Sequence, residues 1–257
     1  MSKWNAKQYS IFQKERTLPA VNLANAIMKD NVQSVLDIGC GIGNSTAVLK
    51  DKFQTATVIG IDSSDDMLDS ARKNHPDITF MKLDAGKEIE TITERFDVIF
   101  SNACIQWIPD HKQLLQSFMQ LLNLDGVLAI QIPQQYKHPM HKIIRNVSES
   151  NKWRDKITVS RTFHNLKEEE YFDILSELSS DFRMWETVYF HQMPSHKSIV
   201  EWYKGTALRP ILEQLSDTDK EEFEQDILAE TEKIYPVQKN GEIIFRFPRL
   251  FFTARKL

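Results

Sequence analysis

A glycine turn and an acid stand at the ends of two neighbouring apolar runs near the start of the chain. The first run, Val35–Ile38, leads into Gly39, Gly41 and Gly43, and the second run ends at Asp62. The pattern predicts a strand, a glycine turn, a helix and a second strand that ends in a carboxylate. This order is typical of a nucleoside-binding βαβ unit, in which the acid accepts hydrogen bonds from ribose hydroxyls. Three glycines within five residues allow tight turning and close approach of a ligand to the backbone. The residues therefore predict a nucleoside site.

The spacing of the glycines argues against a dinucleotide. A pyrophosphate site has the pattern G-x-G-x-x-G at a helix N-terminus, whereas this chain has G-x-G-x-G with Asp37 before the first glycine. A carboxylate at that position repels a pyrophosphate and attracts a cation. S-adenosylmethionine (AdoMet) has a ribose and an adenine, carries no phosphate and ends in an ammonium group. We therefore predict AdoMet as the cofactor, with Asp37 facing its ammonium directly or through water.

These residues resemble the first motif of a known family, the class I AdoMet-dependent methyltransferases, which is an acid followed by GxGxG. Over nearly its whole length, the chain also resembles the group of these enzymes that methylates trans-aconitate. This second resemblance rests on scattered segments, among them Trp4-Asn5, Gln106-Trp107, Leu208-Arg209-Pro210 and Phe247-Pro248-Arg249. It implies an O-methyltransferase that esterifies a carboxylate of a small polycarboxylic acid.

The resemblance also implies further cofactor contacts. Asp84 matches the family acid that pairs with the adenine amino group beside the Ala85 backbone, and it equally fits a helix cap. Ser63 and Met67 are expected to flank the ribose and adenine, although Met67 also suits the core. Asn102 follows the fourth predicted strand, where it reaches the methionine portion. The predicted cofactor residues are Asp37, Gly39, Gly41, Gly43, Asn44, Asp62, Ser63, Met67, Asp84, Ala85 and Asn102.

A small acid fits the residues after the fourth strand better than a nucleic acid does. Methyltransferases for exocyclic amino groups have Asp/Asn-Pro-Pro-Tyr there, and cytosine C5 enzymes need a Pro-Cys nucleophile. This chain has Ser101-Asn102-Ala103-Cys104, and Gln134 follows Pro133. Arginines bind carboxylates through a planar fork, although any single arginine also fits a solvated surface. The predicted substrate residues are Tyr9, Arg16, Gln106, Trp107, Tyr136, Arg209, Arg246 and Arg249.

The predicted reaction needs few catalytic groups from the protein. Methyl transfer from a sulfonium is an in-line displacement whose main requirement is alignment. A carboxylate is already ionised at neutral pH, because its reference pKa is about 4. We therefore predict no catalytic base and no metal, only positioning. Four histidines are interpreted as structural or solvated, namely His138, His141, His191 and His196.

Short apolar runs alternate with helical patterns up to about residue 133. Strands are predicted at Ser34–Ile38, Thr57–Ile61, Ile78–Lys82, Phe96–Ser101 and Gly126–Ile132. Helices are predicted at Pro19–Met28, Asn44–Lys52, Ser64–Asn74 and His111–Leu122. Such alternation predicts an α/β fold, with a doubly wound, mostly parallel sheet and a ligand at the carboxyl ends of its strands.

After residue 133 the pattern changes. Helices are predicted at His138–Ser150, Glu168–Leu178, Lys197–Leu215 and Thr218–Ile234, and strands at Glu186–Gln192 and Ile243–Ala254. Ser195 and Ser216 are predicted N-caps. The resemblance implies that the two strands are the sixth and an antiparallel seventh of a Rossmann-like methyltransferase sheet. Residues 195–235 then form a helical lid inserted between them, or helices that only cover the sheet edge. One domain is expected over residues 1–257, with its AdoMet-binding core at 30–133.

Composition narrows the possible partners. The chain has 257 residues, of which 41% are hydrophobic and 26% charged, and a formal net charge of −4. Nucleic acid is not an expected partner, because binding its phosphate backbone needs a basic face on the protein. A membrane is not expected either, because a segment that spans a bilayer needs a long apolar run. Two cysteines and a polar N-terminus favour a cytoplasmic protein. Two alternatives stay open: methylation of another small acid or a hydroxyl metabolite, and a sensor that binds AdoMet without turnover.

Overall fold

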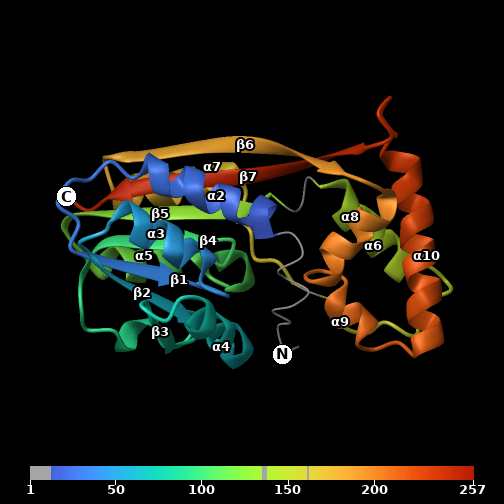
Figure 1. Ribbon diagram of the computed structural model, residues 1–257, viewed down its shortest axis with the longest axis horizontal. Helices are drawn as coiled ribbons and strands as arrows, with labels where there is room; N and C mark the ends of the chain where they lie inside the picture. The colour runs from blue at the N-terminus through green and yellow to red at the C-terminus, as the bar shows by residue number, and fades with distance from the viewer. Residues whose placement is uncertain (1–12, 135–137, 161) are drawn as a thin grey trace.

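The computed structural model describes residues 13–134, 138–160 and 162–257. In these ranges, seven strands form one sheet in the order β3-β2-β1-β4-β5-β7-β6 (Figure 1). The strands are β1 (Ser34–Ile38), β2 (Thr57–Asp62), β3 (Thr79–Lys82), β4 (Phe96–Asn102), β5 (Leu122–Pro133), β6 (Phe182–Met193) and β7 (Ile243–Arg255). β1 to β5 are parallel, and β7 is antiparallel to both β5 and β6. The predicted doubly wound, mostly parallel sheet is confirmed.

Helices cover both faces of this sheet. They are α2 (Gln13–Ala26), α3 (Asn44–Lys52), α4 (Asp65–Asn74), α5 (His111–Gln120) and α7 (Glu168–Leu178), with the 3-10 helices η1 (Ile89–Thr91) and η2 (Ile105–Trp107). α2 and α3 lie on one face, where Leu23, Leu49 and Phe100 share a buried apolar core. α5 and α7 lie over a separate core that contains Leu115 and Leu175. The sheet is thus buried on both sides, as a parallel sheet must be.

The strand register brings the predicted cofactor residues to one edge of the sheet. Ile38, the last residue of β1, pairs with Ile61 of β2, so the glycine turn and Asp62 follow at the same level. On the other side of β1, Asn102 of β4 pairs with Gln131 of β5. Polar residues that are far apart in the sequence therefore lie close together at the carboxyl ends of the parallel strands.

β6 and β7 run on beyond the end of β5. β7 pairs with β5 from Arg249 to Arg255, whereas its pairing with β6 begins earlier, at Ile243. Four helices gather at this extension, at the right of Figure 1: α6 (Pro139–Ser148), α8 (His196–Lys204), α9 (Arg209–Leu212) and α10 (Asp217–Ile234). They share a core that includes Trp153, Phe223 and Phe245. No helix in the described residues is long and apolar enough to cross a membrane.

The predicted single helix Lys197–Leu215 is wrong. α8 ends at Lys204 with Gly205 as its C-cap, and α9 begins at Arg209 with Pro210 in its first turn. A proline fits the first turn of a helix but removes a hydrogen bond from the interior, so it starts a new helix here. The predicted N-caps are confirmed, because Ser195 Oγ accepts from Ser198 N–H and Ser216 Oγ accepts from Asp219 N–H.

Candidate active site

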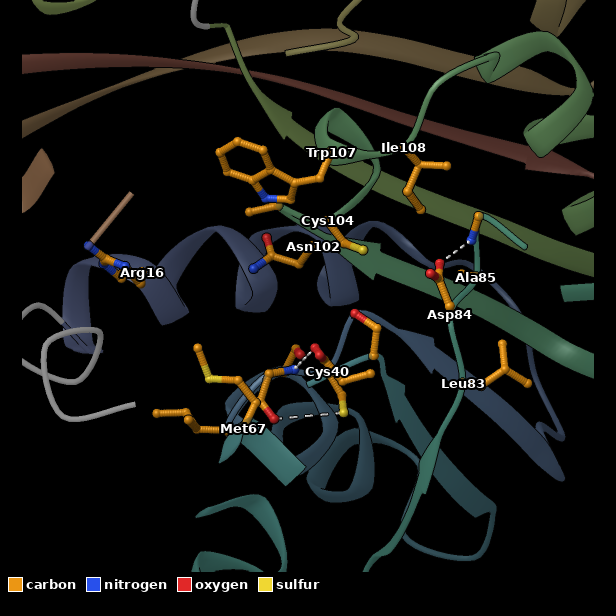
Figure 2. A pocket seen from close by; sticks show the side chains of 18 of the residues that line it. Arg16, Cys40, Met67, Leu83, Asp84, Ala85, Asn102, Cys104, Trp107 and Ile108 are labelled. Carbon is orange, nitrogen blue, oxygen red and sulfur yellow. Dashed lines mark hydrogen bonds between the residues drawn. The ribbon is translucent and has the colours of Figure 1, made fainter. Parts of the chain in front are cut away.

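A cavity of about 610 Å³, here called the large cavity, opens at the carboxyl ends of the parallel strands. Much of its wall comes from the glycine turn, the end of β2 and the loops after β3 and β4. The predicted cofactor residues that line it are Gly39, Gly41, Asn44, Asp62, Ser63, Met67, Asp84, Ala85 and Asn102. Figure 2 shows Met67 on one side of this space and Asn102 and Trp107 on the other. Of the predicted cofactor set, Asp37 and Gly43 lie outside this lining.

The turn between β1 and α3 requires its glycines for two different reasons. The angle φ is +73° at Gly39 and +89° at Gly43, in the left-handed region that other residues avoid. A Cβ at Gly39 would lie 2.2 Å from Cys104 Sγ, so this glycine lets β1 and the loop after β4 approach each other. A Cβ at Gly43 would lie 2.7 Å from His75 Cδ2 and 3.0 Å from Phe80 Cζ. Gly43 thus serves the packing of α3 rather than the cavity surface.

Two acids place carboxylates in the wall of the large cavity. Asp62 Oδ2 accepts from Gly41 N–H at 2.9 Å, and Asp62 Oδ1 accepts from Ser64 N–H at 2.9 Å. Burial raises the pKa of Asp62, and these N–H donors partly oppose that rise. Asp84 Oδ1 accepts from Gly86 N–H at 3.0 Å. An ionised carboxylate has about four lone-pair sites, so both acids keep acceptor capacity for donors on a ligand.

Asp37 is fully buried at the end of β1. Ser45 Oγ and Thr46 Oγ1 each donate to its Oδ2 at 2.7 Å. Its Oδ1 has no hydrogen-bond partner within the described ranges. Burial raises the pKa of Asp37 to about 6, against the opposing effect of the two hydroxyl donors. The carboxylate is therefore held by the start of α3 and is costly to ionise without a nearby cation.

A second cavity of about 60 Å³, here called the small cavity, adjoins the large one. Arg16, Ala103 and Trp107 line both cavities and so form their shared wall. The other residues of the small cavity include Gln106, His141, Tyr203, Phe247 and Arg249. Among the lining residues that the structure describes, two are arginines and none is acidic. The small cavity therefore has the charge for an anion.

Each of the two arginines is held by a ring face and a hydrogen bond. Arg16 Nη2 donates to the Trp202 carbonyl at 3.3 Å, and Arg16 Cζ lies 4.9 Å from the centroid of the Trp202 ring. Arg249 Nη1 donates to Gln131 Oε1 at 3.2 Å, and Arg249 Cζ lies 4.7 Å from the Phe247 ring. Only 7% of Arg16 and 4% of Arg249 is exposed. Two permanent positive charges thus border a small aromatic space.

Comparison with known proteins identifies the family. Residues 35–126 match a family described as a methyltransferase domain. Over 257 residues, the chain is 39% identical to the trans-aconitate 2-methyltransferase of Escherichia coli strain K12 / DH10B, with 100% of both chains covered. The chain belongs to the class I S-adenosylmethionine-dependent methyltransferases. The methyltransferase is also 40% identical, over 256 residues, to the enzyme of the same name from E. coli strain 55989 / EAEC, covering 100% of this chain and 99% of that one.

Solved structures have the same fold. The YcgJ protein of Bacillus subtilis matches with a TM-score of 0.59 at 13% identity, covering 93% of the methyltransferase and 98% of that chain. Phosphoethanolamine N-methyltransferase 2 of Haemonchus contortus, in complex with S-adenosyl-L-methionine, matches with a TM-score of 0.55 at 21% identity, covering 95% and 53%. These similarities show a shared arrangement of helices and strands.

The large cavity of the methyltransferase fits AdoMet. Its volume of about 610 Å³ lies within the usual range for small-molecule sites, roughly 300 to 1,000 Å³. A Cβ at Gly41 would meet no atom within 4 Å, so the turn faces open space at this point. The carboxylates of Asp62 and Asp84 suit hydroxyl and amino donors, and Met67 supplies an apolar surface for a ring.

The structure does not bring every predicted substrate residue to these cavities. Tyr9 and Tyr136 lie outside the described residues. Arg246 of β7 is exposed, with its Cζ 5.2 Å from the Phe190 ring, because alternate residues of a strand face opposite sides. Arg209 Nε pairs with Glu213 at 2.9 Å, outside the lining of both cavities. The structure therefore places Arg16 and Arg249 at the small cavity and leaves Arg209 and Arg246 outside the lining of both cavities.

Several cavity residues carry no signal in the sequence. Val159, Ser160 and Thr162, from the irregular loop between α6 and α7, line the large cavity. Gln214 joins this loop to the helical segment after β6: its Oε1 accepts from Val159 N–H at 2.9 Å, and its Nε2 donates to the Val159 and Pro210 carbonyls at 2.7 Å each. An irregular loop has no periodicity from which such contacts can be predicted.

His141 lines the small cavity, although the sequence did not place it near the substrate. Its ring meets Phe163 and Tyr203 edge-on, with centroids 4.9 and 5.3 Å apart. Burial, with a smaller effect of His138, lowers the pKa of His141 to about 3, so the imidazole is neutral at physiological pH. His138, by contrast, is structural, because its ring nitrogens lie 3.0 Å from Tyr203 Oη and 2.8 Å from the Arg246 carbonyl.

The buried carboxyl of Asp37 makes a pH dependence of stability testable. Its pKa is about 6 in the folded protein, above the ordinary value of 3.8 that an unfolded chain has. A folded state that holds a proton more tightly loses stability as pH rises from the unfolded to the folded pKa. The free energy of unfolding of the wild type should therefore fall by about 2 kcal/mol between pH 4 and pH 7, relative to Asp37→Asn. Urea unfolding of both proteins without ligand measures this difference.

The difference between the unfolding free energies of the two proteins cancels the contribution of the other carboxyl groups, which titrate in both. It also removes any constant effect of the new amide. Stability curves that stay parallel between pH 4 and pH 7 would contradict a raised pKa at Asp37.

Proposed function

We propose that this methyltransferase transfers the methyl group of AdoMet to a carboxylate oxygen of a small polycarboxylic acid, with trans-aconitate as the best candidate. The observation that carries the proposal is the small cavity, which borders the large one and is lined by Arg16 and Arg249. The relatives named trans-aconitate 2-methyltransferase, at 39% identity over the full length, support this substrate.

We assign the large cavity to AdoMet and give its residues the following roles. Asp62, at the end of β2, accepts hydrogen bonds from the ribose hydroxyls, and Asp84 beside Ala85 accepts from the adenine amino group. Asn102 lies beside the methionine portion, and Asp37 balances the ammonium charge through the glycine turn. When bound, AdoMet would supply a methyl group on a sulfonium: the carboxylate oxygen would form its bond to the methyl carbon in line with the breaking S–C bond, and S-adenosylhomocysteine would leave. The shared wall formed by Arg16, Ala103 and Trp107 is where the acceptor oxygen meets it.

Charge matching supports a tricarboxylate. Such an acid brings three negative charges, and Arg16 and Arg249 with the sulfonium bring three positive ones. Methylation removes one charge from each side, because the carboxylate becomes an ester and the sulfonium a thioether. The two arginines then balance the two remaining carboxylates. A monocarboxylate has no further carboxylate to offer the two arginines once its own has become an ester, so it forms fewer charge-assisted contacts.

The alternative of a hydroxyl acceptor is less well supported, because a hydroxyl must lose a proton during transfer. His141 is the imidazole in the small cavity, and a pKa of about 3 makes it a weak base. A carboxylate needs no base, since it is ionised before it enters. The proposed reaction therefore uses the protein for alignment and charge matching.

We also infer that α8, α9 and α10 act as a lid over the site. Pro210 at the start of α9 borders the large cavity, and Gln214 ties the loop at Val159 to the same segment. A lid that excludes water favours the reaction, because attack on a sulfonium is faster when the nucleophile loses hydration.

A label-transfer assay with AdoMet tests the proposed function. We expect turnover with trans-aconitate, with lower kcat/KM for cis-aconitate and isocitrate and none for fatty acids. Tight AdoMet binding with no turnover on any of these acids would contradict the proposal and favour a sensor. Turnover on a hydroxyl metabolite alone would favour the other alternative.

Removing the carboxylate of Asp62 should weaken AdoMet binding. Charge-assisted hydrogen bonds to two hydroxyls are each worth about 1.5 to 3 kcal/mol, so Asp62→Ala should raise the Kd for AdoMet by at least about 100-fold. Isothermal titration calorimetry measures this change. Asp65→Ala is the matched control, because it removes an exposed acid that pairs with Lys82 outside the large cavity. Equal affinities for the two variants would refute the ribose assignment.

Arg249 and Arg246 make a matched pair on one strand. Arg249→Gln should raise the KM for trans-aconitate by about 10- to 100-fold, since a buried charge-assisted contact is lost. Its Kd for AdoMet should stay within about twofold of the wild type, because Arg249 lies outside the large cavity. Arg246→Gln removes the same charge from the exposed side of β7 and should leave both constants unchanged. A KM that rises equally in both variants would mean that net charge, and not the small cavity, attracts the acid.

A further inference from the structure

We propose that Trp202 and Phe247 determine substrate specificity, because they hold the guanidiniums of Arg16 and Arg249 at a fixed separation and so select acids by the distance between their carboxylates. This inference rests on the proposed function, since it concerns the acid that the small cavity receives. Trp202 and Phe247 also line the small cavity, and their proposed role in specificity is to position the two arginines.

The two rings lie beside each other, and each carries one guanidinium. Their centroids are 5.5 Å apart, with an interplanar angle of 52°. Arg16 Cζ lies 4.9 Å from the Trp202 ring, and Arg249 Cζ lies 4.7 Å from the Phe247 ring. Arg16 also donates to the carbonyl of Trp202, so one residue of α8 supplies both of these contacts. The position of each positive charge therefore follows the position of a ring.

The rings themselves have little freedom. Trp202 is 3% exposed and Phe247 is 7% exposed. Phe245 packs against both, with centroids 5.7 Å from Trp202 and 5.5 Å from Phe247. His191 lies 5.1 Å from Trp202 and 6.1 Å from Phe247. Closely packed side chains keep single rotamers, so this cluster sets the separation of the two guanidiniums more firmly than the long arginine side chains do.

A fixed pair of guanidiniums discriminates between geometric isomers. A guanidinium that stacks on a ring presents its N–H groups in its own plane, where a carboxylate accepts two of them. Carboxylates on a carbon–carbon double bond are held rigidly, and the cis and trans isomers place them at different distances. An acid with the right distance binds both arginines without distortion, whereas its isomer must move one of them. The two isomers of aconitate carry the same charge, so they test distance alone.

The experiment compares the ratio of kcat/KM for trans-aconitate to that for cis-aconitate in three variants. Phe247→Leu removes the ring under Arg249 and keeps an apolar side chain. Phe251→Leu is the matched control: it makes the same change on the same side of β7, and no guanidinium of the described residues is found over its ring. The Phe251 ring stacks on Trp185 and belongs to a different core from Trp202 and Phe247. Phe247→Tyr restores a ring. Thermal unfolding shows how far each variant loses stability.

We expect Phe247→Leu to raise the KM for the preferred isomer by roughly 3- to 30-fold and to reduce the isomer ratio by at least about threefold. Phe251→Leu should lose comparable stability and keep the wild-type ratio, and Phe247→Tyr should restore the ratio. Trp202→Leu tests the other ring in the same way. A wild-type ratio in Phe247→Leu, or an equal loss in Phe251→Leu, would overturn the inference while the proposed function stands. Wild-type protein that neither binds nor methylates either isomer would overturn both.

Discussion

The antiparallel strand β7 fixes the relation between the two cavities. Its second half, from Arg249 onward, completes the parallel sheet by pairing with β5, and the first pair joins Arg249 to Pro133 at the end of β5. Its first half continues along β6 and carries Phe245 and Phe247 into the core of α6, α8 and α10. β6 pairs with both halves of β7, so Arg249 lies where β7 gains β5 as a second neighbouring strand. Because one continuous strand spans both parts, the helical segment cannot shift along the sheet without breaking its hydrogen bonds.

The two ends of the site contain buried groups of opposite charge. Asp37 has two hydroxyl donors and remains costly to ionise, which makes its region favourable for a cation. Arg16 and Arg249 cannot lose their charge, and ring faces and hydrogen bonds stabilise it among the aromatic side chains. The wall near Asp37 therefore favours a cation, and the small cavity favours an anion.

Much of this arrangement follows from local sequence patterns. The apolar runs and the glycine turn predict β1, β2 and the position of Asp62, because a parallel strand and its turn are encoded within a few residues. The alternation of Phe245, Arg246 and Phe247 also contains the signal that separates Arg246 from Arg249, since residues two apart share a side of a strand. The break at Pro210 is likewise readable as a helix start. What no local pattern encodes is which distant segments meet, such as Gln214 with the loop at Val159, or His141 with the arginines.

The same burial that holds the arginines also limits the reaction. Burial lowers the pKa of His141 to about 3 and raises the pKa of the Cys104 thiol and of the Tyr203 hydroxyl, so these cavity groups stay neutral near pH 7. The described carboxylates that line the cavities, Asp62 and Asp84, belong to the large cavity and not to the small one. Among the described residues that line the small cavity, there are thus charge partners for an acid and none suited to take a proton. Under the proposed function, these conditions favour an acceptor that arrives ionised over one that must first be deprotonated. The packing that holds the two guanidiniums in position therefore also favours a carboxylate as the nucleophile.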